Sequence, residues 1–164
     1  MYVVLLTGGR DWAHPDPIQQ LLAEIKNSRG PDEVLVLRHG RAARGADVLG
    51  DRIGRVLGYQ IDACPASWYD PCDPVFCDRP GVHRRSDRNG DSYCPQAGNR
   101  RNQYMIDKWP RPDEVVAFPA PSSRGTWHCV NAARVARIPV RGPGIRPVAP
   151  PAPMLPLDLS EAGP

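Results

Sequence analysis

The chain has 164 residues, of which 41% are hydrophobic, and its formal net charge at neutral pH is +3. This length suits one domain with a buried core and is short for two. The weak positive charge tolerates anionic ligands, but it is lower than expected for a protein built mainly to bind nucleic acid. The sequence holds no continuous apolar run of about eighteen residues, so it predicts no membrane span.

The first residues and the cysteines indicate where the protein works. The start of the chain, "MYVVLLTGGR", lacks the basic segment and the cleavage site of a signal peptide and is typical of a first strand. The five cysteines are an odd number, which disfavours a closed set of disulfides. We therefore expect a cytoplasmic protein in a reducing environment.

Strands alternate with helices through most of the chain. Short apolar, β-branched runs predict strands buried on both faces, and apolar residues at helical spacing predict helices between them. In chain order we expect strand 2–6, a helix that begins at the prolines at 15 and 17 and ends near Gly30, strand 33–37, helix 46–57, strand 59–64, helix 98–109, strand 114–118, helix 125–136 and strand 138–141. This order predicts a Rossmann-like, three-layer α/β sandwich with a parallel sheet over residues 1–141.

Two segments do not follow this alternation. Residues 66–97 form an insertion with little apolar periodicity, four prolines and several arginines. Residues 142–164 are rich in proline, so we expect an extended or disordered tail, either simply solvated or recognised by a proline-binding partner.

The stretch "TGGRDW" follows the first strand and precedes the first helix, at the sheet edge where such folds bind ligands. It is not the dinucleotide motif G-x-G-x-x-G, because Arg10 and Ala13 stand where that motif needs glycines. Gly8 and Gly9 still allow a phosphate to approach the backbone and the helix N-terminus. The alternative is a tight turn that needs positive φ, with Arg10 paired to Asp11 or Asp47.

Other loops at the same expected edge are also rich in small and basic residues. The second strand is followed by "RHGRAARGAD" and the fourth by "FPAPSSRGT", which offers hydroxyls and amides at a helix N-terminus. The helix "AGNRRNQYM" carries arginines in its first turn, where they oppose the helix dipole unless an anion lies nearby. Several anion-compatible loops that converge on one edge favour a binding site there.

Five motifs in this order resemble those of the SLOG superfamily, in its YspA-type branch related to circularly permuted YpsA proteins. These motifs are "TGGRDW", "HG…GAD", "CPASW", "AGNRRNQYM" and "AFPAPSSRGT". The resemblance covers residues 1–141 apart from the insertion. It implies a Rossmann-like fold that binds nucleotide derivatives, with the Lonely Guy phosphoribohydrolases as distant relatives. It also implies a phage or actinobacterial source, and hence a host-cytoplasm location for a phage protein.

The resemblance also implies roles for particular residues around a nucleotide or nucleotide-sugar ligand. Phosphate groups would lie against the glycine and hydroxyl loops, and the ribose or phosphate would contact the arginine helix. The implied ligand-binding residues are Gly8, Gly9, Arg10, Asp11, Gly45, Asp47, Trp68, Arg101, Asn102, Ser123, Gly125 and Thr126.

This chain departs from the phosphoribohydrolase pattern at its catalytic position. Those enzymes carry a glutamate within three residues of the glycine-threonine loop, whereas this chain has His128 and Cys129 there. We therefore expect a binding protein that senses or sequesters a nucleotide. The alternative is an N-glycosidic hydrolase that recruits Arg101, Asp47 or Asp11 as catalytic groups. In the second loop, Arg41 also stands where a glycine is usual.

The insertion contains Cys72, Cys77, His83 and Cys94 in the spacing C-x4-C-x5-H-x10-C. Three thiolates and one imidazole suit tetrahedral Zn²⁺, and a segment this poor in apolar residues needs such a staple to become ordered. We therefore expect a structural zinc site, in which Cys64 is an alternative to His83. A disordered loop with free cysteines and a single disulfide are the other interpretations.

Partners beyond a small molecule are less defined. Arginines in and after the insertion make a zinc-assisted nucleic-acid-binding module a third hypothesis, but interleaved aspartates favour a solvated, ion-paired surface. The helical faces at 45–57 and 98–109 are compatible with a homodimer. We expect no membrane partner.

Overall fold

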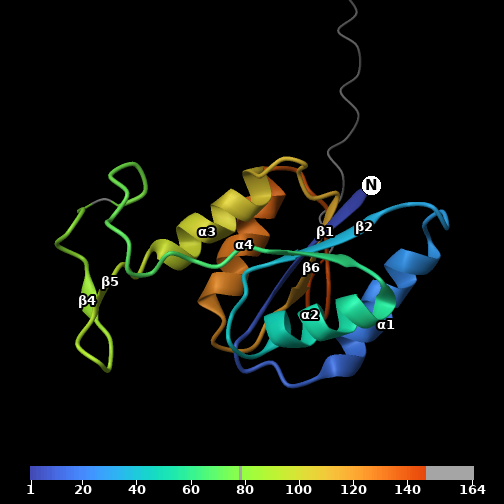
Figure 1. Cartoon of the computed structure of the whole chain (residues 1–164), viewed down its shortest axis with the longest axis horizontal. Helices are drawn as coiled ribbons and strands as arrows, with labels where there is room; N and C mark the ends of the chain where they lie inside the picture. Colours follow the sequence, from blue (N-terminus) through green and yellow to red (C-terminus); the bar gives the residue numbers. More distant parts are fainter. Residues whose placement is uncertain (78, 147–164) are drawn as a thin grey trace, which may run out of the picture.

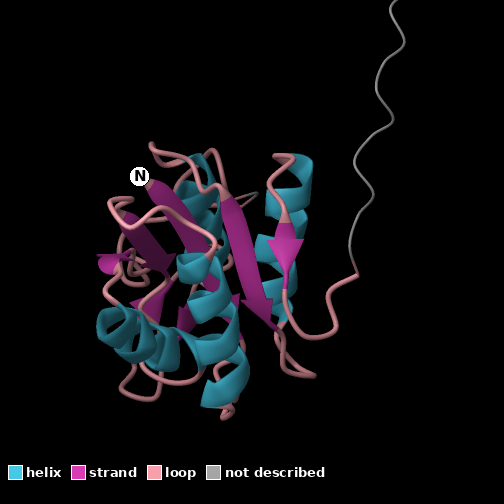
Figure 2. Ribbon diagram, turned by 90° about the vertical axis from the view of Figure 1, so that its right-hand side faces the viewer, coloured by secondary structure: helices cyan, strands magenta, loops and turns pink. Residues whose placement is uncertain are grey.

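The computed structural model describes residues 1–77 and 79–146 as a parallel sheet covered by helices on both faces (Figures 1 and 2). The main sheet has five strands in the order β3-β2-β1-β6-β7, and every neighbouring pair is parallel. Its strands are β1 (Tyr2–Gly8), β2 (Leu35–His39), β3 (Gln60–Ala63), β6 (Glu114–Phe118) and β7 (Val140–Arg141). The helices are α1 (Pro15–Asn27), α2 (Ala46–Leu57), α3 (Ala97–Asp107) and α4 (Arg124–Val135). The predicted α/β class is confirmed.

The core lies in two layers, one on each face of the sheet. Because side chains alternate along a strand, Val4 and Leu6 of β1 pack against α1 and α2, whereas Leu5 packs against α3 and α4. This arrangement explains why the first strand is apolar without interruption. Cys129 is buried in the second layer, as expected for a core thiol.

The element boundaries differ from the prediction by a few residues, most clearly in the second strand. The apolar run predicted residues 33–37, but β2 extends through two polar residues, Arg38 and His39, which are 1% and 2% exposed. Arg38 is tolerated there because it donates to Asp62 Oδ2 at 2.8 Å and to three backbone carbonyls of the α3 end and the following turn. The charge is therefore paired and hydrogen-bonded, as a buried guanidinium requires.

The connections reverse direction beside β1. The chain runs from β1 outward to β2 and β3, then returns to add β6 and β7 on the other side of β1. The point between the carboxyl ends of β1 and β6 is therefore the topological switch point, where open α/β sheets form their ligand-binding crevice.

The insertion forms a small lobe that projects from the strand ends (Figure 1). It contains an antiparallel hairpin of β4 (Arg85–Ser86) and β5 (Ser92–Tyr93), which the sequence pattern did not predict. The tail is described only as far as residue 146, so the prediction for 147–164 lies outside the described residues. Within the described part of the chain, the helices are too short and too polar to cross a membrane.

Candidate anion-binding cleft and metal centre

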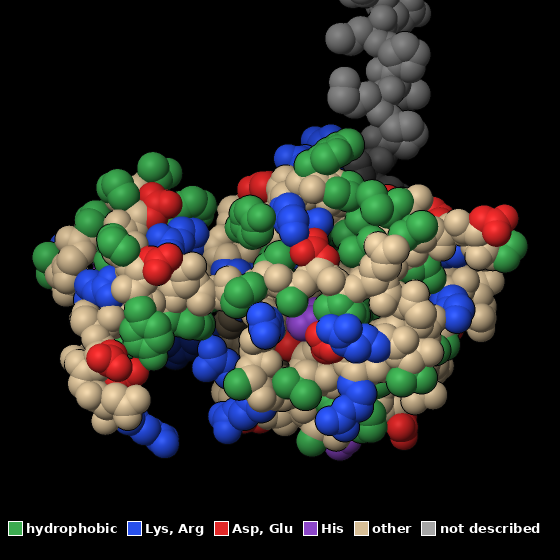
Figure 3. Space-filling view, in the orientation of Figure 1, with side chains coloured by type: hydrophobic (Ala, Val, Ile, Leu, Met, Phe, Trp, Pro, Cys, Tyr) green, Lys and Arg blue, Asp and Glu red, His purple; other side chains and the backbone are tan. Residues whose placement is uncertain are grey.

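A cleft of about 920 Å³ lies at the carboxyl edge of the sheet, at the switch point. Of the twelve residues predicted to bind a ligand, all but Gly45 line it. Figure 3 shows Lys and Arg side chains gathered along the hollow between the insertion and the main body. Further cleft residues that the residue-by-residue prediction missed are Arg41, Arg44, Arg88, Asn99 and Arg124. Most of them lie in the segments "RHGRAARGAD", "AGNRRNQYM" and "FPAPSSRGT", which the sequence had already indicated as anion-compatible.

Gly8 and Gly9 are required for close packing and not for an unusual backbone conformation. A Cβ at Gly8 would lie 3.0 Å from the carbonyl oxygen of Phe118, and one at Gly9 would lie 3.1 Å from the backbone nitrogen of Ala120. Neither glycine has a positive φ, so the alternative interpretation, a turn that needs positive φ, is wrong at these two positions. The small residues let the end of β1 lie directly against the loop after β6.

Gly45 is the positive-φ residue of this region. Its φ is +80°, it precedes α2, and its Cα faces the backbone of Gly9 and Arg10. It therefore packs against the backbone of the "TGGRDW" loop and does not line the cleft.

The N-terminus of α4 opens into the cleft. Thr126 is 3% exposed and lines the cleft, yet its hydroxyl has no hydrogen-bond partner among the described residues. The space above Gly125 is empty, since a Cβ built there would meet nothing within 4 Å. The N–H groups of Arg124 and Thr126 donate to the carbonyl oxygens of Ser122 and Ser123, which leaves the Gly125 N–H without a backbone partner among the described residues. The first turn of a helix also carries positive potential. The Ser123 hydroxyl, by contrast, is already engaged with the backbone of Ala120.

Arg101 is a largely buried cation at the base of the cleft. Its guanidinium donates to the carbonyl oxygens of Gly40 and Cys64 and to Asn102 Oδ1, which are all neutral acceptors. Burial lowers the pKa of Arg101, and the nearby Asp47 carboxylate opposes that shift. No carboxylate of the described residues forms an ion pair with Arg101. Arg101 therefore places a positive charge in the cleft without a direct ion pair.

The two cleft carboxylates lie in different environments. Asp47 is 6% exposed and accepts a hydrogen bond from the Ala42 N–H at 2.9 Å. Asp11 is exposed and forms an ion pair with Arg44 at 3.2 Å. The suggested pairing of Arg10 with Asp11 or Asp47 is therefore wrong, and the Arg10 guanidinium instead lies 5.7 Å from the centre of the Trp68 ring.

The residues at the catalytic position of the phosphoribohydrolases do not reach the cleft. His128 is half-buried on the outer side of α4, where it contributes to a separate groove with α3. Cys129 lies in the core, and burial raises the pKa of its thiol to about 11. Neither side chain is placed to act on a ligand in the cleft.

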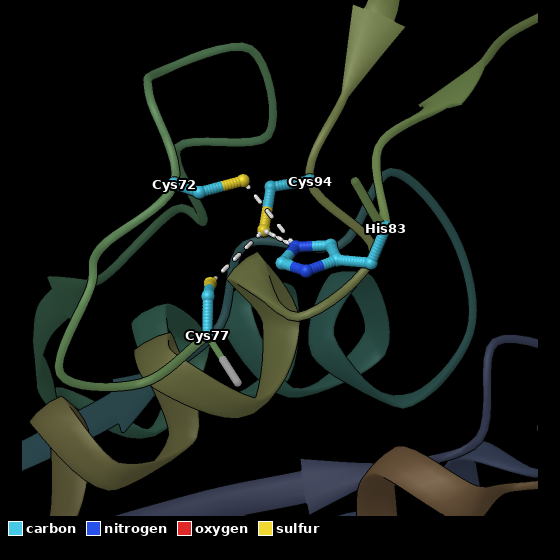
Figure 4. A group of neighbouring side chains, drawn as sticks. All are labelled: Cys72, Cys77, His83 and Cys94. Carbon is cyan, nitrogen blue, oxygen red and sulfur yellow. Dashed lines mark hydrogen bonds between the residues drawn. The ribbon is translucent and has the colours of Figure 1, made fainter. Parts of the chain in front are cut away.

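The predicted metal ligands lie together in the insertion (Figure 4). The donor atoms of Cys72, Cys77, His83 and Cys94 all lie within 4.8 Å of one another. His83 Nε2 is 3.3 Å from Cys72 Sγ and 3.2 Å from Cys94 Sγ, and Cys77 Sγ is 3.7 Å from Cys94 Sγ. Tetrahedral zinc with ordinary bond lengths places such donors about 3.5–3.8 Å apart, so the cluster can hold a metal ion.

The positions of these side chains decide between the interpretations that the sequence spacing left open. His83 belongs to it, whereas Cys64 lies near Asp62 and Lys108, outside the group. The cysteines are free, so the described structure contains no disulfide. Hydrogen bonding from the Gly81 backbone lowers the pKa of the Cys72 thiol to about 7 despite the opposing effect of burial, which favours the thiolate that metals bind.

The arginines of the insertion do not form the direct ion pairs that the interleaved aspartates suggested. Arg84 is used within the loop, where it donates to the carbonyl oxygens of Asp70 and Ser92. Asp87 accepts hydrogen bonds from the Tyr69 hydroxyl and from backbone N–H groups of its own turn. Among the described residues, the expected ion pairs between arginines and aspartates of the insertion do not form.

The fold and these sites define a Rossmann-like α/β protein with a basic cleft at its switch point and a cysteine-histidine cluster in an inserted lobe. No protein-family model matches the chain. The chain is 31% identical over 147 residues to the Gene 61 protein of Mycobacterium phage D29, and the match covers 88% of this chain and 98% of that protein. The chain therefore belongs to the family of this phage protein, in agreement with the predicted phage association.

Proposed function

We propose that the protein binds a nucleotide or nucleotide-sugar derivative in the cleft and thereby senses or sequesters it. The observation that carries the proposal is the largely buried Arg101 guanidinium, which lines the cleft and is hydrogen-bonded only to neutral oxygens. A buried charge is costly unless it is paired, and a phosphate would pair it.

The N-terminus of α4 supports the same ligand class. A phosphate there would accept hydrogen bonds from the unpartnered Thr126 hydroxyl and from the Gly125 N–H, which has no backbone partner among the described residues. The cleft volume of about 920 Å³ leaves room for a base and sugar beside the phosphate. The motif resemblance to the YspA-type SLOG proteins is consistent with this ligand, and we propose membership of that superfamily as part of the same hypothesis.

Zinc is the metal that we propose for the cysteine-histidine cluster. Three thiolates and one imidazole suit Zn²⁺, and four protein ligands close the coordination shell. Zinc would order the insertion, and its closed shell leaves no position for a substrate.

The first experiment is a thermal-shift panel on the zinc-loaded protein with AMP, ADP, adenosine-diphosphate-ribose and cyclic dinucleotides, followed by chromatography of each stabilising compound after incubation. The proposal expects at least one compound to raise the melting temperature and to be recovered intact. If none does, the cleft is not a nucleotide site of this kind.

A matched pair of variants locates the binding. Gly125→Ala places a methyl group in the empty space at the α4 N-terminus, where the phosphate would lie, and should abolish the shift without destabilising the fold. Gly30→Ala also places a methyl group in open space, in a loop outside the cleft, and should bind as the unmodified protein does. Equal binding by both variants would argue against a phosphate at α4.

Hydrolysis of an N-glycosidic bond is the second candidate function, and the position of Asp47 favours it. Asp47 is the buried carboxylate among the described cleft residues, whereas Asp11 is exposed and paired with Arg44. A hydrolase would release free base and ribose phosphate in the chromatography step. Asp47→Asn would then abolish turnover while ligand binding persists.

A further inference from the structure

The metal cluster and the cleft share one segment of chain. The insertion leaves the end of β3 at the cleft edge, passes through the four metal ligands and returns to the cleft at the start of α3. Both ends of this segment line the cleft. The lining residues that it contributes are Ala66, Trp68, Arg88 and Pro95.

Cys94 joins the cluster to the cleft wall directly. Its N–H donates to the carbonyl oxygen of Trp68 at 2.8 Å, and its own carbonyl accepts from the N–H of Ala97, the first residue of α3, at 3.1 Å. Cys94, Cys77 and Ala97 also form the small buried core of the insertion, against which Trp68 packs.

Trp68 and α3 connect the core of the insertion to Arg10 and Arg101, the residues expected to bind the anion. The Trp68 ring lies against Gly98, where a Cβ would come within 2.9 Å of the ring, and the Arg10 guanidinium stands 5.7 Å from the ring centre. Arg101 follows Gly98 by three residues, so it lies on the same side of α3 one turn later.

The insertion has little else to hold it in place. Its hairpin strands are two residues each, and its buried core consists of two metal-ligating cysteines and one alanine. Folding of a segment with so little apolar burial depends on its metal, because the free energy of metal binding is then the free energy of ordering.

We propose that metal binding at Cys72, Cys77, His83 and Cys94 controls ligand binding in the cleft, by fixing Trp68 and the start of α3. This regulation rests on the proposed nucleotide site. Linkage then requires reciprocity: metal raises the affinity for the ligand, and ligand raises the affinity for the metal by the same factor. The protein would therefore bind its nucleotide more tightly while the cluster is loaded.

The test compares the zinc-loaded protein with the same protein after chelation, using ADP as probe in calorimetry. The expected Kd for ADP is at least ~10-fold weaker in the chelated form, and the Kd for Zn²⁺ shifts by the same factor when ADP is saturating. Equal ADP affinity in the two forms would overturn the proposal. Far-UV circular dichroism, with slow amide exchange in β1, checks that the main sheet remains folded in the chelated protein.

Three variants distinguish loss of the metal from displacement of the Trp68 ring. Gly98→Ala forces the Trp68 ring away while leaving all four ligands in place, so it should keep Zn²⁺ and weaken ADP binding. His83→Cys keeps four metal-binding side chains and should restore the coupling that His83→Ala removes. Full ADP affinity in the Gly98→Ala protein would contradict the assigned role of Trp68.

A readout that needs no nucleotide keeps this inference separate from the proposed function. Zn²⁺ alone should change the tryptophan fluorescence and should slow amide exchange over residues 97–101. Trp68→Phe should remove the fluorescence change, whereas Trp109→Phe, at an exposed site 85% accessible, should keep it. If these effects occur but ADP does not bind, the metal does order Trp68 and the start of α3, and the nucleotide proposal is wrong. If Zn²⁺ alters neither signal, the coupling itself is wrong.

Discussion

Arg101, on α3, donates a hydrogen bond to the carbonyl oxygen of Gly40, the residue that follows β2. Gly40 must be a glycine for this contact, because a Cβ there would overlap the guanidinium. A helix on one face of the sheet is thereby tied to a strand end at the cleft, and a positive charge is held between them. The same contact positions Arg101 and limits its movement.

Replacing Arg101 tests its charge. We expect Arg101→Gln to weaken binding of the nucleotide by at least ~10-fold, because a charge-assisted bond to phosphate is lost. The free energy of unfolding should fall by about 1–3 kcal/mol through the lost bonds to Gly40 and Cys64. Arg100→Gln, one residue away and outside the cleft, is the control and should leave binding unchanged. Isothermal calorimetry and urea unfolding measure the two effects.

Arg41 combines a cleft position with a backbone conformation that favours glycine. Its φ is +51°, in the left-handed region, and its N–H donates to His39 Nδ1 at 3.1 Å. We expect Arg41→Gly to leave the free energy of unfolding unchanged or to raise it by up to about 1 kcal/mol, since the strain of a side chain at positive φ is removed. Nucleotide affinity should fall several-fold because a cleft cation is lost.

The matched control for Arg41 is Arg137, which has a φ of +58° and lies outside the cleft. Arg137→Gly should relieve strain in the same way and leave nucleotide affinity unchanged. Loss of affinity in both variants would show that net charge, and not the position of Arg41, determines binding.

The metal site predicts one Zn²⁺ ion per chain, measured by elemental analysis of the purified protein. Cys77→Ser should lose the metal, because a hydroxyl is a poor replacement for a thiolate ligand. Cys64→Ser should retain it, since Cys64 lies outside the cluster. Cobalt substitution offers a spectroscopic check, with thiolate charge-transfer bands expected in the Cys64→Ser protein and reduced in the Cys77→Ser protein.

The sequence predicts which loops meet at the cleft better than it predicts the contacts that hold those loops in place. Parallel strands end at one edge, so loops after the strands at 2–6, 33–37 and 114–118 had to meet there. The cysteines and histidine of the insertion predict its metal site, because several such residues in one short segment are found mainly at metal sites or in disulfides. Gly45 was misplaced because its role, supporting Gly9 from behind, depends on contacts between loops that a one-dimensional pattern does not show.

Arg38 illustrates what local patterns miss. Its carbonyl partners on Met105, Lys108 and Pro110 lie 67, 70 and 72 residues further along the chain. A charged residue therefore ends the apparent apolar run early, although in the fold it continues the strand. The hairpin of the insertion was missed for the opposite reason, because strands of two residues are too short to show alternation.

Asp62 links this buried arginine to the acid stability of the protein. Burial alone raises the pKa of the Asp62 carboxyl, but hydrogen bonds from Lys108 and Arg38 outweigh it and hold the pKa below its usual value. The bonds are 2.6 Å from Lys108 Nζ and 2.8 Å from Arg38 Nε. A carboxyl with a depressed pKa in the folded state stabilises the fold above its unfolded pKa, near 4, and this contribution is lost as pH falls through the folded value.

Asp62→Asn should therefore lower the free energy of unfolding by about 2 kcal/mol at pH 7, because Arg38 loses its charged acceptor. The difference from the unmodified protein should shrink below about pH 4 and vanish once Asp62 itself is protonated. Urea unfolding from pH 7 to pH 3 measures this convergence. Asp32→Asn, at an exposed residue without an ion pair among the described residues, should follow the unmodified curve throughout. A constant gap between the Asp62→Asn and unmodified curves at every pH would show that the carboxylate charge does not stabilise Arg38.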